Sequence, residues 1–175
     1  MRLTVFSDNA LRCLIYLGTT ETRTATVGEI ATRMEMSEDH LLKVVKRLVQ
    51  LGLVRTIRGR HGGIQLAQPP EEIRVAAVVR ATEDNLALVA CFDPASAPCP
   101  IAPACVLAGA LEEALGAFFA VLDRYTLADL VRQRRRLSSL VGGNGMSVGD
   151  PVERVHAVRP ETLPPLSTAG RRART

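Results

Sequence analysis

Two short amphipathic helices followed by a basic hairpin occupy residues 26–66, and no other pattern in the chain constrains the fold as much. Thr26 and Glu29 have the spacing of a capping box, which predicts a short helix that begins there. Ser37 is the predicted N-cap of a second helix, whose apolar side chains recur every three or four positions until Gly52 ends it. Two short helices in this order predict a helix-turn-helix.

A hairpin rich in arginine follows the second helix. Apolar side chains alternate with basic or polar ones over residues 53–58, residues 59–63 read GRHGG, and residues 64–66 continue as Ile-Gln-Leu. Two short runs joined by a glycine-rich turn predict a pair of antiparallel strands. With the two helices they predict a winged helix-turn-helix domain over residues 1–70.

Positive charge is concentrated in the second helix and the hairpin. Residues 37–60 contain six basic and two acidic side chains, so this segment alone carries +4, which equals the net charge of the whole chain. An isolated basic run is usually a solvated face, but its coincidence with a helix-turn-helix and a wing predicts binding to double-stranded operator DNA. Short polar groups at the helix start suit base edges, later basic groups suit phosphates, and the hairpin tip suits a narrow minor groove. The candidate contacts are Ser37, Asp39, His40, Lys43, Lys46, Arg47, Arg58, Arg60 and His61.

The rest of the chain is predicted to be mainly helical. Aromatic residues make up only 3% of the sequence and tryptophan is absent, so the core must consist of Leu, Val, Ile and Ala, which favours helices. We expect helices over residues 5–17, with Gly18 as the C-cap, over residues 73–89 and over residues 106–125. The last helix has a long apolar stripe that needs a partner surface, which predicts a homodimer. This stripe consists of Leu107, Leu111, Leu115, Phe118, Phe119 and Leu122.

The expected fold class is therefore mainly α, a winged helix-turn-helix domain with a small β-hairpin wing plus a long C-terminal dimerisation helix. Behind the DNA-binding domain we expect a helix and a cysteine loop over residues 71–105 and the dimerisation helix with its extension over residues 106–140. A flexible basic tail is expected over residues 141–175. The apolar run at the N-terminus is too short and too charged for a signal peptide or a membrane span, so we expect a cytoplasmic protein without a membrane partner.

Three cysteines lie close together in a loop rich in proline and small residues. Seven residues separate Cys91 from Cys99, and five separate Cys99 from Cys105. These gaps are longer than those of usual structural zinc sites or ferredoxin clusters, and Asp93 is the only carboxylate oxygen donor inside the loop. Three soft thiolates suit an iron–sulfur cluster whose last iron is held by a ligand from elsewhere. A zinc site, a thiol–disulfide switch and three buried thiols without a ligand remain as alternatives.

Two residues of the first helix are also relevant to this chemistry. Cys13 lies near Phe6, Ala10 and Leu14 on a helical wheel, and we expect it to pack as a small buried hydrophobe. Asp8, taken alone, is a first-turn carboxylate that interacts favourably with the helix dipole.

Catalytic signatures are not found in the sequence. The three histidines, His40, His61 and His156, fall in the predicted recognition helix, the hairpin and the tail, and no Ser/His/Asp set accompanies them. The GRHGG segment lies between two strands and does not open a helix, as a phosphate-binding loop would. We therefore predict that the chain is not an enzyme. A cluster-dependent enzyme or electron carrier is the competing class, and turnover without DNA affinity would distinguish it.

Several segments resemble one group of bacterial regulators. They read MRLTVFSDNALRCLIYL, SEDHLLKVV, GLVRTIRGRHGGIQLA, EEIRVAAVVRATE, CPIAPAC and LDRYTLADLV, and they extend from residue 1 to about residue 131. In these segments the chain resembles the NsrR-type nitric-oxide-sensing iron–sulfur repressors, winged-helix regulators whose family also includes IscR and RirA.

The resemblance implies a homodimer with one iron–sulfur cluster per protomer, 4Fe–4S by preference and 2Fe–2S as the alternative. It implies Cys91, Cys99 and Cys105 as ligands and Asp8 of the partner subunit as the fourth. It also implies a repressor in which nitrosylation of the cluster releases operator DNA. The seven-residue first gap resembles that of RirA, so an iron- or cluster-supply-responsive regulator with the same fold is the alternative function.

Overall fold

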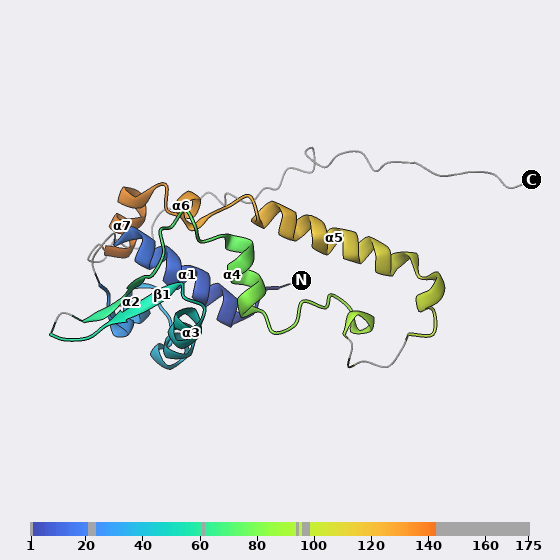
Figure 1. Ribbon diagram of the computed structural model, residues 1–175, viewed down its shortest axis with the longest axis horizontal. Coiled ribbons are helices and arrows are strands. Elements are labelled where there is room, and N and C mark those ends of the chain that lie inside the picture. Colours follow the sequence, from blue (N-terminus) through green and yellow to red (C-terminus); the bar gives the residue numbers. More distant parts are fainter. Residues whose placement is uncertain (1, 21–23, 61, 94, 96–98, 143–175) are drawn as a thin grey trace, which may run out of the picture. The chain divides into compact units, whose positions relative to one another are not determined.

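The computed structural model describes residues 2–20, 24–60, 62–93, 95 and 99–142 (Figure 1). Its architecture is mainly helical with one two-stranded antiparallel sheet, as the sequence predicts. No helix in these residues is long and apolar enough to cross a membrane. In chain order the elements are α1 (Val5–Thr19), α2 (Val27–Arg33), α3 (Glu38–Gln50), β1 (Val54–Ile57), β2 (Gly63–Leu66), α4 (Val75–Thr82), the short 3-10 turns η1 (Ala90–Phe92) and η2 (Ala102–Ala104), α5 (Val106–Leu122), α6 (Leu127–Leu130) and α7 (Arg134–Gly142).

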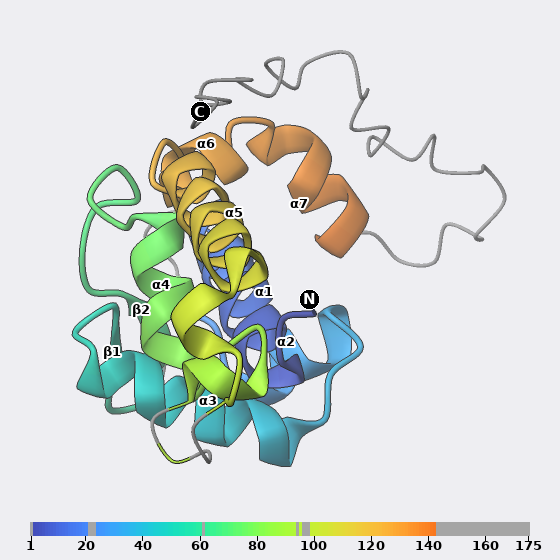
Figure 2. The ribbon, with the colours of Figure 1, turned by 90° about the vertical axis from the view of Figure 1, so that its right-hand side faces the viewer.

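Helix α1 is the element around which the others pack. It contacts α3, α4, α6 and α7, and α2 packs in turn on α3 (Figures 1 and 2). The main core joins α1 side chains such as Leu14 and Leu17 to Leu41 and Leu48 of α3 and to Val131 behind α6. All five of these side chains are at most 1% exposed, so α1 and α3 share one core with a segment some 80 residues downstream of α3.

The predicted helix boundaries of the helix-turn-helix are confirmed. The Thr26 hydroxyl accepts a hydrogen bond from the Glu29 amide at 3.1 Å, and the Glu29 carboxylate accepts one from the Tyr16 hydroxyl of α1 at 2.7 Å. Ser37 is the N-cap residue of α3, although its hydroxyl makes no capping hydrogen bond. Gly52 follows α3 with φ of +68°, a left-handed conformation that glycine adopts without a steric penalty.

The predicted hairpin is also confirmed, with a first strand shorter than the predicted 53–58 and a second strand that begins one residue before the predicted 64–66. Strands β1 and β2 pair from Val54 opposite Leu66 to Ile57 opposite Gly63. A side chain at Gly62 would collide with the carbonyl of Ile57, which explains the glycine before the second strand. Ala25, just before α2, adds a bridge to β2, so the wing is anchored to the helix-turn-helix at its base.

The prediction that Gly18 caps α1 is wrong. The helix continues to Thr19, and Gly18 is inside its last turn. A Cβ atom at Gly18 would lie 3.0 Å from Val131 Cγ1 and 3.7 Å from Leu127 Cδ2. The glycine therefore permits the segment around α6 to approach α1 closely.

The helix predicted over residues 73–89 is shorter in the structure. It is α4, and its C-cap Glu83 is already extended, with φ of −87° and ψ of 126°. Asn85 Oδ1 accepts a hydrogen bond from the Ala87 amide at 2.7 Å, and such a local turn competes with helix continuation. The long helix predicted to reach residue 125 ends at Leu122 as α5.

Helix α5 has two apolar stripes, and the predicted one mostly faces its own protomer. Phe119 is 6% exposed and packs with Ala76 and Val79 of α4 in a second, smaller core, and Leu115 and Phe118 line this core. The other stripe is exposed and recurs at alternating spacings of three and four along the helix. It consists of Ala110, Ala114, Ala117 and Val121, together with Leu107, the member of the predicted stripe that is itself exposed.

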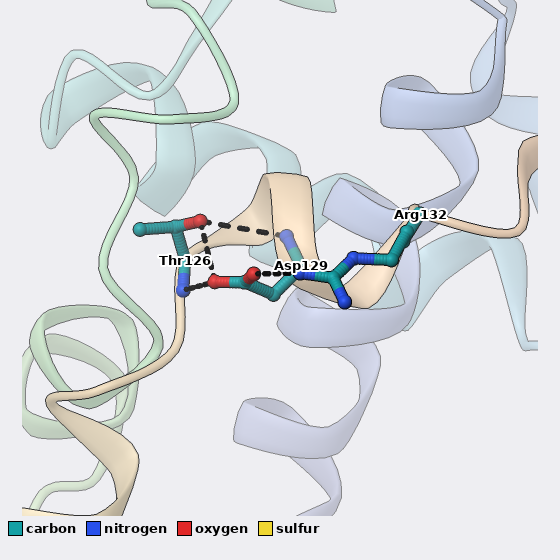
Figure 3. Close-up of polar contacts among 3 residues, drawn as sticks. All are labelled: Thr126, Asp129 and Arg132. Carbon is teal, nitrogen blue, oxygen red and sulfur yellow. Dashed lines mark hydrogen bonds and ion pairs between the residues drawn. The ribbon is translucent and has the colours of Figure 1, made fainter.

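A capping box begins α6 behind the end of α5 (Figure 3). The Asp129 carboxylate accepts hydrogen bonds from the Thr126 amide and hydroxyl, each at 2.9 Å. These bonds lower the pKa of Asp129 below its ordinary 3.8, because they stabilise the charged form. The same segment pairs with the strand-like residues before α4, where the Leu127 amide donates to the carbonyl of Ile73 at 2.8 Å.

This lowered pKa predicts an acid-sensitive contribution to stability. A carboxyl whose folded pKa is depressed contributes fully at pH above the unfolded value of 3.8, and the contribution is lost as pH falls through the folded pKa. We expect Asp129→Asn to lower the free energy of unfolding at neutral pH and to make its fall below about pH 4 shallower. Urea unfolding at a series of pH values measures both quantities. Identical pH slopes for the two proteins would contradict the prediction.

Candidate functional site

The exposed face of α3 carries most of the predicted DNA contacts. Its opposite face packs in the core through Leu41 and Val44. Asp39, Lys43 and Lys46 are exposed and are spaced by four and three residues, so they lie along one line of the helix. The sequence analysis missed Gln50, which continues this line four residues further on and is exposed. A glutamine amide can read adenine through two hydrogen bonds, so its residue type and helical spacing were the signal for it.

The remaining predicted contacts lie at the ends of this surface. Ser37 and His40 are exposed at the start of α3, and Arg58 and Arg60 are exposed at the hairpin tip. His61, the last of the predicted contacts, lies outside the described residues.

Arg47 is exposed but engaged within the protomer. Its Nε and Nη2 atoms donate hydrogen bonds to the Ala81 carbonyl in the last turn of α4, at 3.2 and 3.0 Å. The guanidinium group of Arg47 is therefore directed toward the end of α4.

The turn between α2 and α3 depends on a residue in a left-handed conformation. Glu35 has φ of 52°, and the Met36 amide donates to the carbonyl of Ala31 at 2.8 Å. This is the hydrogen bond of a Schellman motif, with glutamate in place of the usual glycine. The Arg12 guanidinium of α1 donates to the Met34 carbonyl in the same turn. Arg12 therefore supports the backbone that sets the start of the recognition helix α3.

Asp8, the predicted fourth cluster ligand, lies one helical turn before Arg12. Its carboxylate is 3.8 Å from an Arg12 nitrogen, and the two side chains are 60% and 39% exposed. An exposed pair of this kind contributes little stability, about 0–1 kcal/mol. The Asp8 carboxylate is therefore accessible to a ligand at small cost.

The three loop cysteines are free thiols near the surface. Cys91 in η1 is exposed, whereas Cys99 and the α5 N-cap residue Cys105 are half-buried. Within the described residues, no three His, Cys, Asp or Glu side chains stand together closely enough to hold a metal ion. The donors nevertheless fit an iron–sulfur cluster chemically, because three accessible thiols can all become thiolate ligands.

Cys13 differs from the loop cysteines, as predicted. It is fully buried in the main core, and this burial raises the pKa of its thiol to about 12. A thiol that stays protonated packs as an apolar group and is a poor metal ligand.

Residues 3–133 match the Rrf2 family, described as iron-dependent transcriptional regulators. The chain belongs to the Rrf2 family. It is 49% identical over 142 residues to the HTH-type transcriptional regulator NsrR of Geobacillus kaustophilus, a match that covers 81% of this chain and 97% of the relative. It is 46% identical to NsrR of Bacillus subtilis with the same coverage. The Rrf2 chain is thus a transcriptional regulator and not an enzyme, and regulators of this kind act by binding DNA.

Solved structures agree with the Rrf2 assignment at the level of the fold. IscR of T. potens superposes with a TM-score of 0.63 at 23% identity, over 78% of this chain and 90% of that one. CymR, the global cysteine regulator of B. subtilis, superposes with a TM-score of 0.61 at 25% identity, over 76% of this chain and 98% of the CymR chain.

Proposed function

We propose that this Rrf2 regulator is an operator-binding repressor whose iron–sulfur cluster senses nitric oxide. The observation that carries the proposal is the connection from Asp8 through Arg12 to the Met34 carbonyl, which joins a predicted cluster ligand to the turn before the recognition helix. The relatives named NsrR and the three free thiols in the loop support it.

DNA binding is assigned to α3 and the wing. Lys43 and Lys46 supply charge for phosphates, and the short polar side chains Ser37 and Asp39 lie at the helix start, where a recognition helix meets base edges. The arginines at positions 58 and 60 would reach an adjacent minor groove.

The cluster is assigned to Cys91, Cys99 and Cys105, with Asp8 as the fourth ligand. When bound, it supplies iron atoms with which nitric oxide reacts. A carboxylate is a harder and weaker ligand for such iron than the three thiolates, so the Asp8 bond is the one most easily given up. Thiolate ligation would also draw the segment between Cys91 and Cys105 together around one centre.

Asp8 then connects the presence of the cluster to DNA binding. Its oxygens can serve either a metal ion or Arg12, and Arg12 in turn bonds the turn before α3. Release of Asp8 changes the charge partner of Arg12 and thereby the support of the Glu35 turn, which holds a left-handed non-glycine residue. A change in operator affinity of tenfold to a thousandfold would need a coupling free energy of roughly 1.4–4 kcal/mol. This exceeds the about 0–1 kcal/mol of an exposed pair such as Asp8–Arg12, so the ordering of the cysteine segment on ligation would supply the remainder.

A homodimer is proposed through the exposed stripe of α5. This helix has Glu112 and Glu113 as its only charged residues, and a helix that is apolar on two faces normally has packing partners on both. Alternating spacings of three and four, with alanine at three central positions, allow close approach of a second copy. A dimer would place two recognition helices for half-sites about one helical turn apart.

The test uses anaerobically purified protein with its cluster intact. Operator binding is followed while the protein is titrated either with nitric oxide or with an iron chelator, and we expect nitric oxide to release DNA at doses near the protein concentration. The chelator at low dose is expected to leave binding intact. The opposite result would favour the iron- or cluster-supply-responsive function, which the seven-residue gap between Cys91 and Cys99 also supports.

A further inference from the structure

Three successive residues at the end of α4 are bonded to both α3 and α1. The Ala81 carbonyl accepts the two Arg47 hydrogen bonds from α3 at 3.2 and 3.0 Å. The Thr82 hydroxyl makes a buried hydrogen bond to the Ser7 hydroxyl of α1 at 2.8 Å. The Glu83 carboxylate accepts hydrogen bonds from the amide and hydroxyl of Thr4, at 2.8 and 3.1 Å. We call residues 81–83 with these partners the α4 clasp.

The Arg47 contact is favourable for electrostatic reasons that do not involve DNA. The last four carbonyls of a helix lack partners within the helix, and they carry the negative end of its dipole. A guanidinium group bonded to the Ala81 carbonyl therefore caps α4 from outside. Since the planar fork of arginine donates twice to one oxygen, the contact also fixes the direction of the Arg47 side chain.

The α4 clasp lies where the cysteine segment begins. Helix α4 ends at Thr82, and the first predicted cluster ligand, Cys91, follows nine residues later. The Asn85 side chain in this stretch donates a hydrogen bond to the Asp93 carboxylate, two residues beyond Cys91, at 3.3 Å, so the segment around Cys91 is tied back to a residue next to the clasp. A rearrangement of the cysteine segment therefore pulls on residues that are bonded directly to the recognition helix.

We propose that Arg47 is a positioning residue, which transmits the state of the cysteine segment through the α4 clasp to the recognition helix and does not contact DNA phosphate. This inference rests on the proposed function for the signal, but its geometry is independent of which signal acts. The α4 clasp and the Asp8–Arg12 pair reach α3 at opposite ends. Arg12 supports its first turn through Met34, and Arg47 holds its last turn.

The test compares operator affinity of the cluster-loaded and cluster-free forms over a range of salt concentrations. Arg47→Ala and Arg47→Lys are compared with Lys46→Ala, the adjacent exposed residue of α3 assigned to phosphate. We expect Lys46→Ala to weaken both forms equally and to reduce the slope of log affinity against log salt by about 1 per protomer, hence by about 2 for a bound dimer. We expect Arg47→Ala to keep the wild-type slope and to reduce the affinity ratio between the two forms by about fivefold or more.

Arg47→Lys separates charge from geometry. Lysine keeps the positive charge but lacks the planar fork with which arginine donates twice to one oxygen. A positioning role therefore predicts that Arg47→Lys resembles Arg47→Ala, whereas a phosphate contact predicts that it resembles the wild type. Hydrogen exchange of the amides at the end of α4 gives a readout without DNA, and we expect faster exchange there in both Arg47 variants.

The outcomes are distinguishable. A salt slope that falls by about 1 per protomer in Arg47→Ala, with an unchanged affinity ratio, overturns the positioning role. If the cluster-loaded and cluster-free forms of the wild type bind the operator equally well, the proposed function itself is contradicted. The salt slope and the hydrogen exchange then still decide whether Arg47 contacts phosphate or α4.

Discussion

Replacement of Cys99 by alanine is expected to abolish the iron–sulfur cluster. A cluster held by three thiolates and a weak carboxylate has no spare thiolate in this loop, because residues 91–105 contain no fourth cysteine. The anaerobic absorption spectrum, with iron and sulfide counts per protomer, measures the loss. Cys99 is half-buried in a loop, so we expect the protomer fold to survive the change.

The chain provides a matched control in Cys13. The same substitution, Cys13→Ala, removes a thiol that is buried in the main core and has a pKa of about 12. It is expected to leave the iron and sulfide counts unchanged at a small cost in stability. Equal cluster content in wild type and Cys99→Ala, or cluster loss in Cys13→Ala, would contradict the ligand assignment.

Replacement of Asp8 is expected to affect cluster stability less than replacement of Cys99. Asp8→Ala should leave the cluster assembled but make its loss to a chelator about tenfold faster, which corresponds to roughly 1.4 kcal/mol. Asp8→Cys should slow the loss, because a thiolate is a softer ligand for iron than a carboxylate. Arg12→Ala removes the ion pair and keeps the carboxylate, so it separates the two roles of Asp8. An unchanged rate in Asp8→Ala would exclude Asp8 as a ligand.

The helix-turn-helix and wing were predictable because their signals are local. Thr26 marks a helix start through a hydrogen bond three residues on, Ser37 occupies an N-cap position by residue type, and Gly52 supplies the left-handed conformation behind α3. The glycines of the hairpin satisfy a constraint within one turn. The exposure of Lys43 and Lys46 likewise follows from the period of α3.

The interactions that were missed join residues far apart in the chain. The Arg47 side chain bonds Ala81, which is 34 residues away, so the sequence could identify its charge but not its partner. The contact from Arg12 to Met34 spans 22 residues and ends on a backbone carbonyl, which leaves no mark in the sequence. Gly18 resembled a helix cap, because a glycine required by tertiary packing against Val131 cannot be distinguished from a cap by its position alone.

The apolar stripe of α5 illustrates the same limit. Its large side chains were predicted to face a second copy, but Phe119 is buried against α4 of the same protomer. A helix that is apolar on two faces gives no indication of which face is inward until its neighbour is known.

Replacement of Phe119 by alanine is accordingly expected to destabilise the protomer strongly. Phe119 is 6% exposed, its ring meets Phe118 edge-on at 5.2 Å between centroids, and the Arg80 guanidinium lies 4.3 Å above it. Arg80 is held there by two hydrogen bonds to the Asp123 carboxylate at 3.2 and 3.0 Å. Loss of a buried phenylalanine side chain costs about 3–5 kcal/mol in the free energy of unfolding. Urea unfolding measures this value, and faster hydrogen exchange in α4 would locate the effect.

A substitution on the opposite face of α5 is the control for this prediction. Ala114 is exposed in the middle of the second stripe, and Ala114→Glu is expected to change protomer stability by less than about 0.5 kcal/mol. It should instead dissociate the homodimer, because two glutamates would face each other across a close helix contact. Sedimentation equilibrium measures the dimer, and unfolding at concentrations below its dissociation constant isolates the protomer. If Phe119→Ala dissociated the dimer at unchanged protomer stability, the two faces of α5 would have to exchange roles, and the predicted stripe of large side chains would be the dimer contact after all.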